Sequence, residues 1–151
     1  MTLDDSTKVE NLLREVSRWA SSRSDIAGVV LVGSYARAEP TLASDVDLVI
    51  ICEYPQQLLA DDMWVLTFGS VAHQKREDWG KVQSVRAQYT GGLEVEFGVA
   101  GRDWIDQPLD HGTEEVLNEG VSIIFDRDGY LASMLAKYIT ENRRNGILGE
   151  A

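Results

Sequence analysis

The sequence predicts an α/β (α+β) fold in which a small mixed β-sheet is flanked by helices. Three observations support this class: an amphipathic helical pattern near the N-terminus, two short apolar runs typical of buried strands, and a later hairpin pattern followed by more helical sequence. With 151 residues, the chain has the length of one domain that buries its own hydrophobic core. We therefore expect a single domain over residues 1–151.

The N-terminal part of the chain predicts one helix and two strands. The helix is capped by Asp5 or Ser6, and its apolar residues recur every three or four positions: Val9, Leu12, Leu13, Val16, Trp19 and Ala20. The run Ile26–Val32 has no polar alternation, as expected for a strand covered on both faces. A second apolar strand runs from Val46 to Cys52.

The rest of the chain predicts a hairpin set among helices. The expected elements are, in order, a helix over Leu58–Trp64, an extended segment over Val65–Phe68, a hairpin over Val82–Val99, short helices between Asp103 and Asn118, a strand over Val121–Phe125, a turn over Asp126–Gly129, and a helix carrying Leu131, Met134, Leu135, Tyr138 and Ile139. Within the hairpin, apolar and acidic residues alternate after Gly91-Gly92, so Glu94 and Glu96 share one face of their strand.

The composition narrows the classes of partner. The chain has 14 Lys and Arg against 25 Asp and Glu, which gives a net charge of −11. Such a surface repels phosphate backbones and anionic membranes, so we expect neither long nucleic acid nor a membrane as partner. The single Cys52 cannot form an internal disulfide, the N-terminus is acidic, and no apolar run approaches the ~18 residues of a membrane span. These features predict a cytoplasmic protein.

Two aspartates stand at the start of the second strand. Asp45 and Asp47 are two residues apart, so both point to the same side of the strand, with α-carbons roughly 7 Å apart. Carboxylates beside an apolar run are costly unless a positive charge compensates them. Oxygen ligands without a neighbouring His or Cys favour Mg²⁺ or Mn²⁺ over zinc. The pair predicts a divalent-cation site; the alternative is two strand-edge aspartates that cap a loop.

A bend follows the first strand at Gly33 and Ser34. Glycine lets a phosphate approach the backbone closely, and the serine hydroxyl and the following N–H groups can donate to its oxygens. A carboxylate pair would repel an anion bound there unless a divalent cation lies between the two. The combination therefore predicts a site for a nucleotide and its metal. The alternative for the bend alone is an ordinary turn.

A third carboxylate is needed if two metal ions are to act together. We choose Glu96, with Glu94 as the alternate, because Glu96 stands between Val95 and Phe97, where an uncompensated charge would be costly. The alternative is that both glutamates belong to the solvated face of an antiparallel strand, which is the favoured interpretation for Glu94.

These residues resemble the nucleotidyltransferase superfamily, which includes DNA polymerase beta, the minimal nucleotidyltransferases and the aminoglycoside nucleotidyltransferases. The family pattern is a Gly-Ser turn, a gap of about ten residues, Asp-x-Asp and a later acidic residue; this chain has Gly33-Ser34, Asp45-Val46-Asp47 and Glu96, with Ser44 before the first aspartate and Arg37 after the turn. The stretch from Trp64 to Phe97 is more weakly similar to the aminoglycoside 6-adenylyltransferases.

The resemblance implies a single nucleotidyltransferase domain that uses two Mg²⁺ or Mn²⁺ ions. Asp45, Asp47 and Glu96 would be the catalytic metal ligands, and Glu96 would help to take the proton of the attacking hydroxyl. Gly33, Ser34, Arg37 and Ser44 would bind the nucleoside triphosphate. The implied reaction transfers a nucleoside monophosphate, AMP from ATP, to a hydroxyl of a small molecule such as an aminoglycoside and releases pyrophosphate.

Two other functions stay open. The aminoglycoside enzymes usually carry an additional helical domain for the acceptor, so here a second subunit in a homodimer or a protein partner would supply that part. The first alternative is therefore a minimal nucleotidyltransferase antitoxin that binds and adenylylates a helical toxin partner. The second is a metal-dependent glycosyltransferase, because Asp-x-Asp also binds sugar nucleotides.

Overall fold

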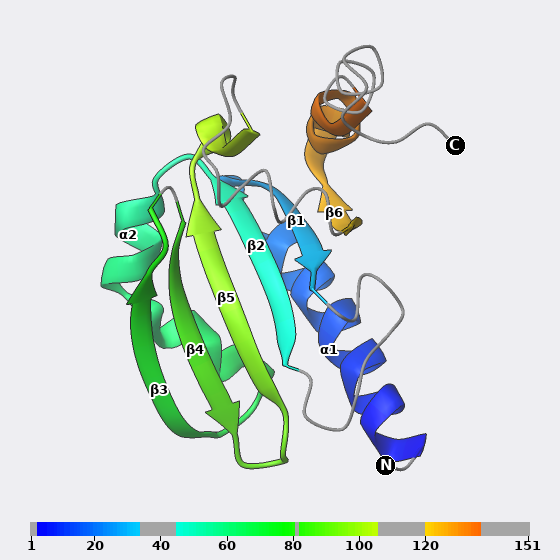
Figure 1. The fold of residues 1–151 in the computed structure, drawn as a ribbon, viewed down its shortest axis with the longest axis vertical. Helices are drawn as coiled ribbons and strands as arrows, with labels where there is room; N and C mark the ends of the chain where they lie inside the picture. The colour runs from blue at the N-terminus through cyan, green and yellow to red at the C-terminus, as the bar shows by residue number, and fades with distance from the viewer. Residues whose placement is uncertain (1–2, 34–44, 81, 106–119, 137–151) are drawn as a thin grey trace.

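The structure, a computed structural model, describes residues 3–33, 45–80, 82–105 and 120–136. In this part of the chain, a six-stranded sheet with the strand order β3-β4-β5-β2-β1-β6 carries helices on its faces (Figure 1). The sheet mixes parallel and antiparallel pairs. The predicted α/β class with a small mixed sheet is confirmed.

The elements have the following bounds. They are α1 (Leu3–Ser21), β1 (Ile26–Val32), β2 (Val46–Cys52), α2 (Pro55–Ala60), the 3₁₀ helix η1 (Asp62–Phe68), β3 (Val71–Asp78), β4 (Gln83–Tyr89), β5 (Glu94–Ala100), the 3₁₀ helix η2 (Arg102–Ile105), β6 (Val121–Asp126) and the 3₁₀ turn η3 (Arg127–Gly129). Residues 130–136 are also helical. None of the helices in the described ranges is long and apolar enough to cross a bilayer.

Helix α1 lies against the sheet with the face that the sequence predicts. Val9, Leu12, Val16 and Ala20 are all buried, because three- and four-residue spacing places them on one side of the helix. Arg127 secures the far end of α1: its guanidinium donates to the backbone carbonyls of Ala20, Ser21 and Arg23. These bonds tie the end of α1 to the segment after β6. The carbonyls of Ala20 and Arg23 also accept from the backbone N–H groups of Arg23 and Ile26.

The central strand β2 positions the acidic residues. It pairs antiparallel with β1 and parallel with β5. Asp47 therefore lies opposite Val32 on one side and opposite Glu96 on the other. The bend after β1 and the carboxylates of two neighbouring strands consequently meet at one end of the sheet.

The two faces of the sheet differ in character. One face packs against α1, α2 and η1 and forms the larger core, which includes Leu48, Trp64 and Phe97 (Figure 1). The opposite face is apolar only near one end, where Trp104 and Leu131 cover it. The rest of that face carries polar and charged side chains from β2, β5, β4 and β3, because alternate residues of a strand point to opposite sides.

Two predictions about local structure are wrong, and one strand was not predicted. Val65–Phe68 is not extended but belongs to η1. The predicted helix over Leu58–Trp64 is two elements, because α2 ends at Ala60 and the Asp61 carboxylate then accepts a hydrogen bond from the backbone N–H of Met63, which begins η1. Strand β3 was not predicted; its sequence is almost entirely polar, and antiparallel pairing with β4 defines it as an edge strand.

The other expected elements agree with the structure as far as it describes them. The hairpin and the last strand are confirmed as β4, β5 and β6. The short helices expected between Asp103 and Asn118 begin with η2, and residues 106–119 lie outside the described residues. The final helix is confirmed over 130–136, whereas Tyr138 and Ile139 lie outside the described part.

Candidate active site

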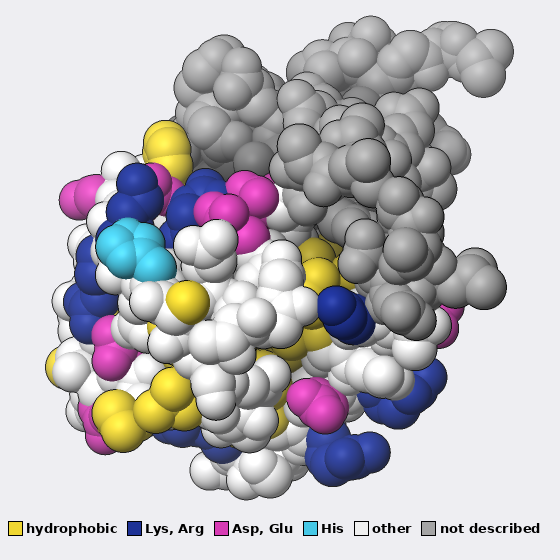
Figure 2. Space-filling model, turned by 90° about the horizontal axis from the view of Figure 1, so that it is seen from below, with side chains coloured by type: hydrophobic (Ala, Val, Ile, Leu, Met, Phe, Trp, Pro, Cys, Tyr) yellow, Lys and Arg dark blue, Asp and Glu magenta, His cyan; other side chains and the backbone are white. Residues whose placement is uncertain are grey.

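The predicted carboxylates come together on the polar face of the sheet. Asp45 directly precedes β2, Asp47 lies on it, and Glu94 and Glu96 lie on the parallel strand β5. The register places Asp47 beside Glu96. In the view of Figure 2, acidic and basic side chains lie interleaved along one side of the molecule. Residues far apart in the sequence thus form one charged cluster.

Gly33 lies directly against Asp47. Its φ is +79°, a conformation that residues with a side chain rarely adopt. A Cβ atom at this position would stand 2.5 Å from Asp47 Oδ2, so any other residue would force the Asp47 carboxylate to move. The bend that was predicted to receive phosphates is therefore adjacent to the carboxylate that was predicted to bind metal. Ser34, Arg37 and Ser44 lie outside the described residues, and their roles remain predictions.

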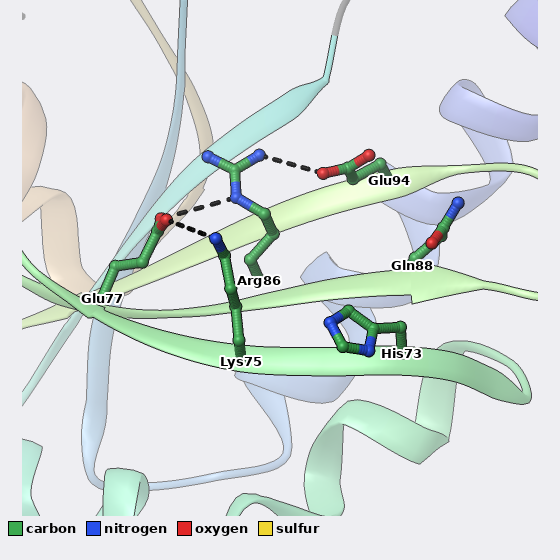
Figure 3. Close-up of a pocket in the computed structure, with 6 residues that line it drawn as sticks. All are labelled: His73, Lys75, Glu77, Arg86, Gln88 and Glu94. Atoms are coloured by element: carbon green, nitrogen blue, oxygen red, sulfur yellow. Dashed lines mark hydrogen bonds and ion pairs between the residues drawn. The ribbon is translucent and has the colours of Figure 1, made fainter.

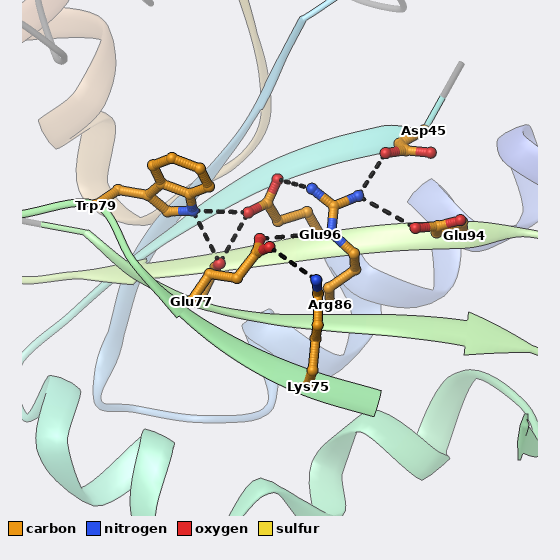
Figure 4. Close-up of polar contacts among 8 residues, drawn as sticks. Asp45, Lys75, Glu77, Trp79, Arg86, Glu94 and Glu96 are labelled. Atoms are coloured by element: carbon orange, nitrogen blue, oxygen red, sulfur yellow. Dashed lines mark hydrogen bonds and ion pairs between the residues drawn. The ribbon is translucent and has the colours of Figure 1, made fainter. Parts of the chain in front are cut away.

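An arginine joins the carboxylates from the next strand. Arg86 lies on β4 opposite Glu96, and only 21% of its side chain is exposed. Its Nη2 donates to Glu96 Oε1 at 2.9 Å, and its Nη1 donates to Glu94 Oε2 at 3.2 Å and to Asp45 Oδ2 (Figure 4). Its Nε donates to Glu77 Oε1 on β3 at 3.4 Å. Four carboxylates consequently share one guanidinium. Burial lowers the pKa of Arg86, but the hydrogen bonds and charges of Asp45, Glu96 and Glu94 outweigh it and raise that pKa above its usual value.

Glu96 is held from its other side as well. Its Oε2 accepts hydrogen bonds from Trp79 Nε1 and from Ser84 Oγ, both at 2.8 Å (Figure 4). Its side chain is only 17% exposed. Three donors therefore fix the orientation of this carboxylate, as charge-assisted hydrogen bonds do in partly buried sites.

Asp47 is the carboxylate of the cluster that lacks such partners. No residue in the described ranges donates a hydrogen bond to it, although Arg86 lies close enough to act on its charge. Burial, and then the negative charges of Glu96 and Asp45, raise the pKa of Asp47 to about 6. Little positive charge or hydrogen bonding balances the negative charge of Asp47. Of the carboxylates in the cluster, it would therefore be stabilised most by a bound cation.

The donor chemistry fits a hard divalent cation near Asp45 and Asp47. All candidate ligands are carboxylate oxygens, which Mg²⁺ and Mn²⁺ prefer. Among the described residues, no three ligating side chains already surround one point. The guanidinium of Arg86 lies among the carboxylates of Asp45, Glu94 and Glu96. On the other side of the cluster, Asp47 accepts no hydrogen bond from the described residues and lies next to the bend at Gly33.

A hollow adjoins the charged cluster. Its volume is about 440 Å³, and its lining comes from β3, β4 and β5: His73, Lys75, Glu77, Arg86, Gln88 and Glu94 (Figure 3). Glu77, Arg86 and Glu94 thus belong both to the hydrogen-bonded cluster and to the hollow. The hollow has room for a small molecule beside Arg86 and Glu94.

Sequence reasoning missed Arg86, Ser84 and Trp79. Alternation along the hairpin could have placed Ser84 and Arg86 on the face of Glu96, given the register across the turn. Trp79 carries no such signal. Three of the four tryptophans belong to the cores, since Trp19 stacks on Trp64 and Trp104 is buried, whereas Trp79 is 58% exposed and contacts Glu96.

The fold and the site place this protein in a class of α/β domains. In this class, carboxylates on neighbouring parallel strands lie close together beside a glycine bend. The family model described as a nucleotidyltransferase domain matches residues 9–83, about half of the chain, and this range includes Gly33, Asp45 and Asp47. The chain belongs to the nucleotidyltransferase superfamily. No curated protein matches the sequence.

Solved structures offer partial likenesses. An aminoglycoside 6-adenyltransferase from Bacillus subtilis is 13% identical, with a TM-score of 0.49 over 64% of this chain and 35% of that one. Cid1 in complex with a UTP analogue is 14% identical, with a TM-score of 0.48 over 78% and 36%. A CCA-adding enzyme is 17% identical, with a TM-score of 0.46 over 85% and 32%. The chain spans about a third of the length of each of these proteins.

Proposed function

We propose that the chain is a Mg²⁺- or Mn²⁺-dependent nucleotidyltransferase that transfers AMP from ATP to a hydroxyl of a small molecule, with an aminoglycoside as the candidate acceptor. One observation carries the proposal: Gly33 and the poorly compensated Asp47 lie in contact, and Glu96 lies beside Asp47 on the neighbouring strand. A triphosphate at the bend and a cation at the aspartates would then share one site. Membership of the nucleotidyltransferase superfamily supports this assignment.

In the proposed reaction, the acceptor hydroxyl oxygen attacks the α-phosphorus of ATP. The bond between that phosphorus and the bridging oxygen of the β-phosphate breaks, and pyrophosphate leaves. Divalent ions, two by the family resemblance, would supply positive charge on the phosphate oxygens. Asp45 and Asp47 would hold them, Gly33 and Ser34 would hold the triphosphate, and Glu96 would bind on the acceptor side and help to take the proton of the hydroxyl.

The hollow beside Glu94 and Arg86 is the proposed acceptor site. The six residues that line it all have polar or charged side chains, which suits a small molecule with several hydroxyl or amino groups. The exposed indole of Trp79 adjoins Glu96 and can pack against an acceptor ring. A net charge of −11 also favours a cationic acceptor over long nucleic acid.

The test measures pyrophosphate release and transfer of label from each α-labelled nucleoside triphosphate, with Mg²⁺ and a panel of aminoglycosides. We expect turnover with ATP, loss of turnover in Asp47→Asn, and unchanged turnover in Asp25→Asn, whose carboxylate pairs with Arg23 away from the site. If Asp47→Asn bound nucleotide and metal as tightly as the unaltered protein, the assignment of the site would be wrong.

A protein acceptor is the second candidate. Met63 and Leu66 are 64% and 47% exposed on η1, and residues three apart in a 3₁₀ helix lie on one side. Such a surface suits a helical partner, as expected of a minimal nucleotidyltransferase antitoxin. In the same labelling experiment with the producing cell's extract, label on a protein rather than on a small molecule would favour this function.

A further inference from the structure

Arg86 divides the carboxylate cluster into two halves with different charge balance. Its guanidinium bonds Asp45, Glu94 and Glu96, and its Nε also bonds Glu77. Asp47 receives no hydrogen bond from the described residues. The Glu96 half of the cluster therefore already has a cation from the protein, and the Asp47 half does not.

The way Glu96 is held shows which of its oxygens could exchange partners. Oε2 is fixed by Trp79 and Ser84, whereas Oε1 bonds only Arg86 among the described residues. If the guanidinium moved away, Oε1 would become free and Glu96 would still be held in place through Oε2. The long side chain of Arg86 lines the hollow formed by β3, β4 and β5 (Figure 3). The guanidinium therefore has open space beside it into which it can move.

We propose that Arg86 is the resident cation of the Glu96 half of the site and competes there with a second divalent ion. The first divalent ion then binds at Asp47 and at Asp45 Oδ1, the oxygen of Asp45 that accepts no hydrogen bond from the described residues, because Arg86 bonds only Oδ2. The second ion binds at Glu96 only after Arg86 has left Oε1. The inference rests on the proposed function, since it concerns the order and affinity of the ions at the same site. It makes Arg86 a positioning residue that acts through Glu96.

The physical reason is competition between two kinds of positive charge for the same oxygens. A guanidinium with hydrogen bonds to several carboxylates is held strongly in a partly buried site. A second ion must replace those bonds, and the cost of doing so lowers its apparent affinity. Removing the guanidinium charge removes this cost and also leaves the carboxylates uncompensated, so an incoming ion should bind more tightly.

The test is a Mn²⁺ titration of the whole chain with a non-hydrolysable ATP analogue, followed by electron paramagnetic resonance of the free Mn²⁺. We expect one tight ion and one at least tenfold weaker ion in the unaltered protein, and a second ion at least tenfold tighter in Arg86→Gln. Arg86→Lys, which keeps the charge but has fewer donors, should lie between the two. Arg102→Gln, which breaks the Glu53 pair elsewhere, should bind both ions as the unaltered protein does.

Thermal unfolding provides a readout independent of ion counting. Arg86→Gln should unfold at a lower temperature in EDTA, and Mg²⁺ should raise its Tm more than it raises that of the unaltered protein. If Arg86→Gln folds only with Mn²⁺ present, it is refolded with the ion, and a second tight ion is still the expected result. Should it not fold even then, Arg86→Lys decides the question through the affinity of its second ion.

The outcomes separate the two proposals. If no divalent ion binds to the unaltered protein in the presence of the analogue, the proposed function fails. If the first ion binds but the second has the same affinity with and without the Arg86 guanidinium, only the inference about Arg86 fails. A purely structural arginine would lower the Tm of Arg86→Gln equally in EDTA and in Mg²⁺, which also overturns it.

Discussion

The backbone of Gly33 lies so close to the carboxylate of Asp47 that a Cβ atom at residue 33 would stand 2.5 Å from Asp47 Oδ2. This contact links the end of β1 to the start of β2 through space, whereas the sequence separates them by a segment outside the described residues. A phosphate at the bend and a cation at the carboxylate would consequently be neighbours.

Substitution of Gly33 by alanine should damage both the fold and the site. The residue has φ of +79°, which costs a residue with a side chain about 1 kcal/mol or more, and the new Cβ would collide with Asp47. We expect Gly33→Ala to lower the free energy of unfolding by at least about that amount and to weaken binding of ATP analogues.

The matched control is Gly91→Ala in the β4–β5 turn, where a new Cβ would meet no atom within 4 Å. Urea unfolding and nucleotide titration of both variants provide the comparison. Equal effects of the two substitutions would show that the contact between Gly33 and Asp47 has no special importance.

Asp47 should make the stability of the metal-free protein depend on pH. Its pKa is about 6 in the fold against about 3.8 in the unfolded chain, so between these values the folded protein binds more protons. Stability should therefore fall as the pH rises from about 4 to about 6. Asp47→Asn should lack this part of the slope and should be more stable than the unaltered protein above pH 6 in EDTA.

With Mg²⁺ and an ATP analogue at neutral pH, this order should reverse, because only the unaltered protein gains stability from the bound ion. Urea unfolding across the pH range, with and without Mg²⁺, measures both effects. A pH profile identical for the two proteins in EDTA would mean that Asp47 has no raised pKa.

Glu96 should matter more for the chemical step than for nucleotide binding. Glu96→Gln keeps the shape of the side chain but loses its charge, and its carboxamide can accept from Trp79 or Arg86 through only one oxygen. We expect kcat to fall roughly 100-fold, with little change in KM for ATP, as for loss of a group that helps to take a proton. Glu94→Gln should have a smaller effect, because Glu94 bonds Arg86 through one oxygen and is 39% exposed.

Trp79 should report on the acceptor. It is the most exposed of the four tryptophans, at 58%, and its Nε1 is fixed by Glu96. Binding of a small acceptor should quench its fluorescence, and Trp79→Ala should raise the KM for the acceptor roughly fivefold through loss of the ring face. Trp79→Phe, which keeps a ring but loses the N–H donor, should raise that KM less. An acceptor KM that is the same in all three proteins would exclude the ring from the acceptor site.

Much of the architecture was readable from local patterns. The uninterrupted apolar runs of β1 and β2 express the burial of those segments, and they predicted both strands with their observed bounds. The apolar spacing of α1 predicted the helix, but α1 begins at Leu3, so the predicted cap residues Asp5 and Ser6 lie inside it. The sequence of the polar strand β3 has no apolar run or spacing from which a strand could be predicted. Its pairing with β4, and not its own composition, makes it a strand.

By itself, the sequence determined the type of chemistry: a glycine bend, two aspartates at strand spacing and a glutamate on a later strand are local features that one segment at a time can carry. Only the tertiary structure decided that Arg86 reaches across β5 to Asp45, that Trp79 and Ser84 hold Glu96, and that Asp47 is left without a hydrogen bond from the described residues. The physical reason is that charge compensation depends on distances between strands, and the register of the sheet sets those distances between residues that are remote in the chain.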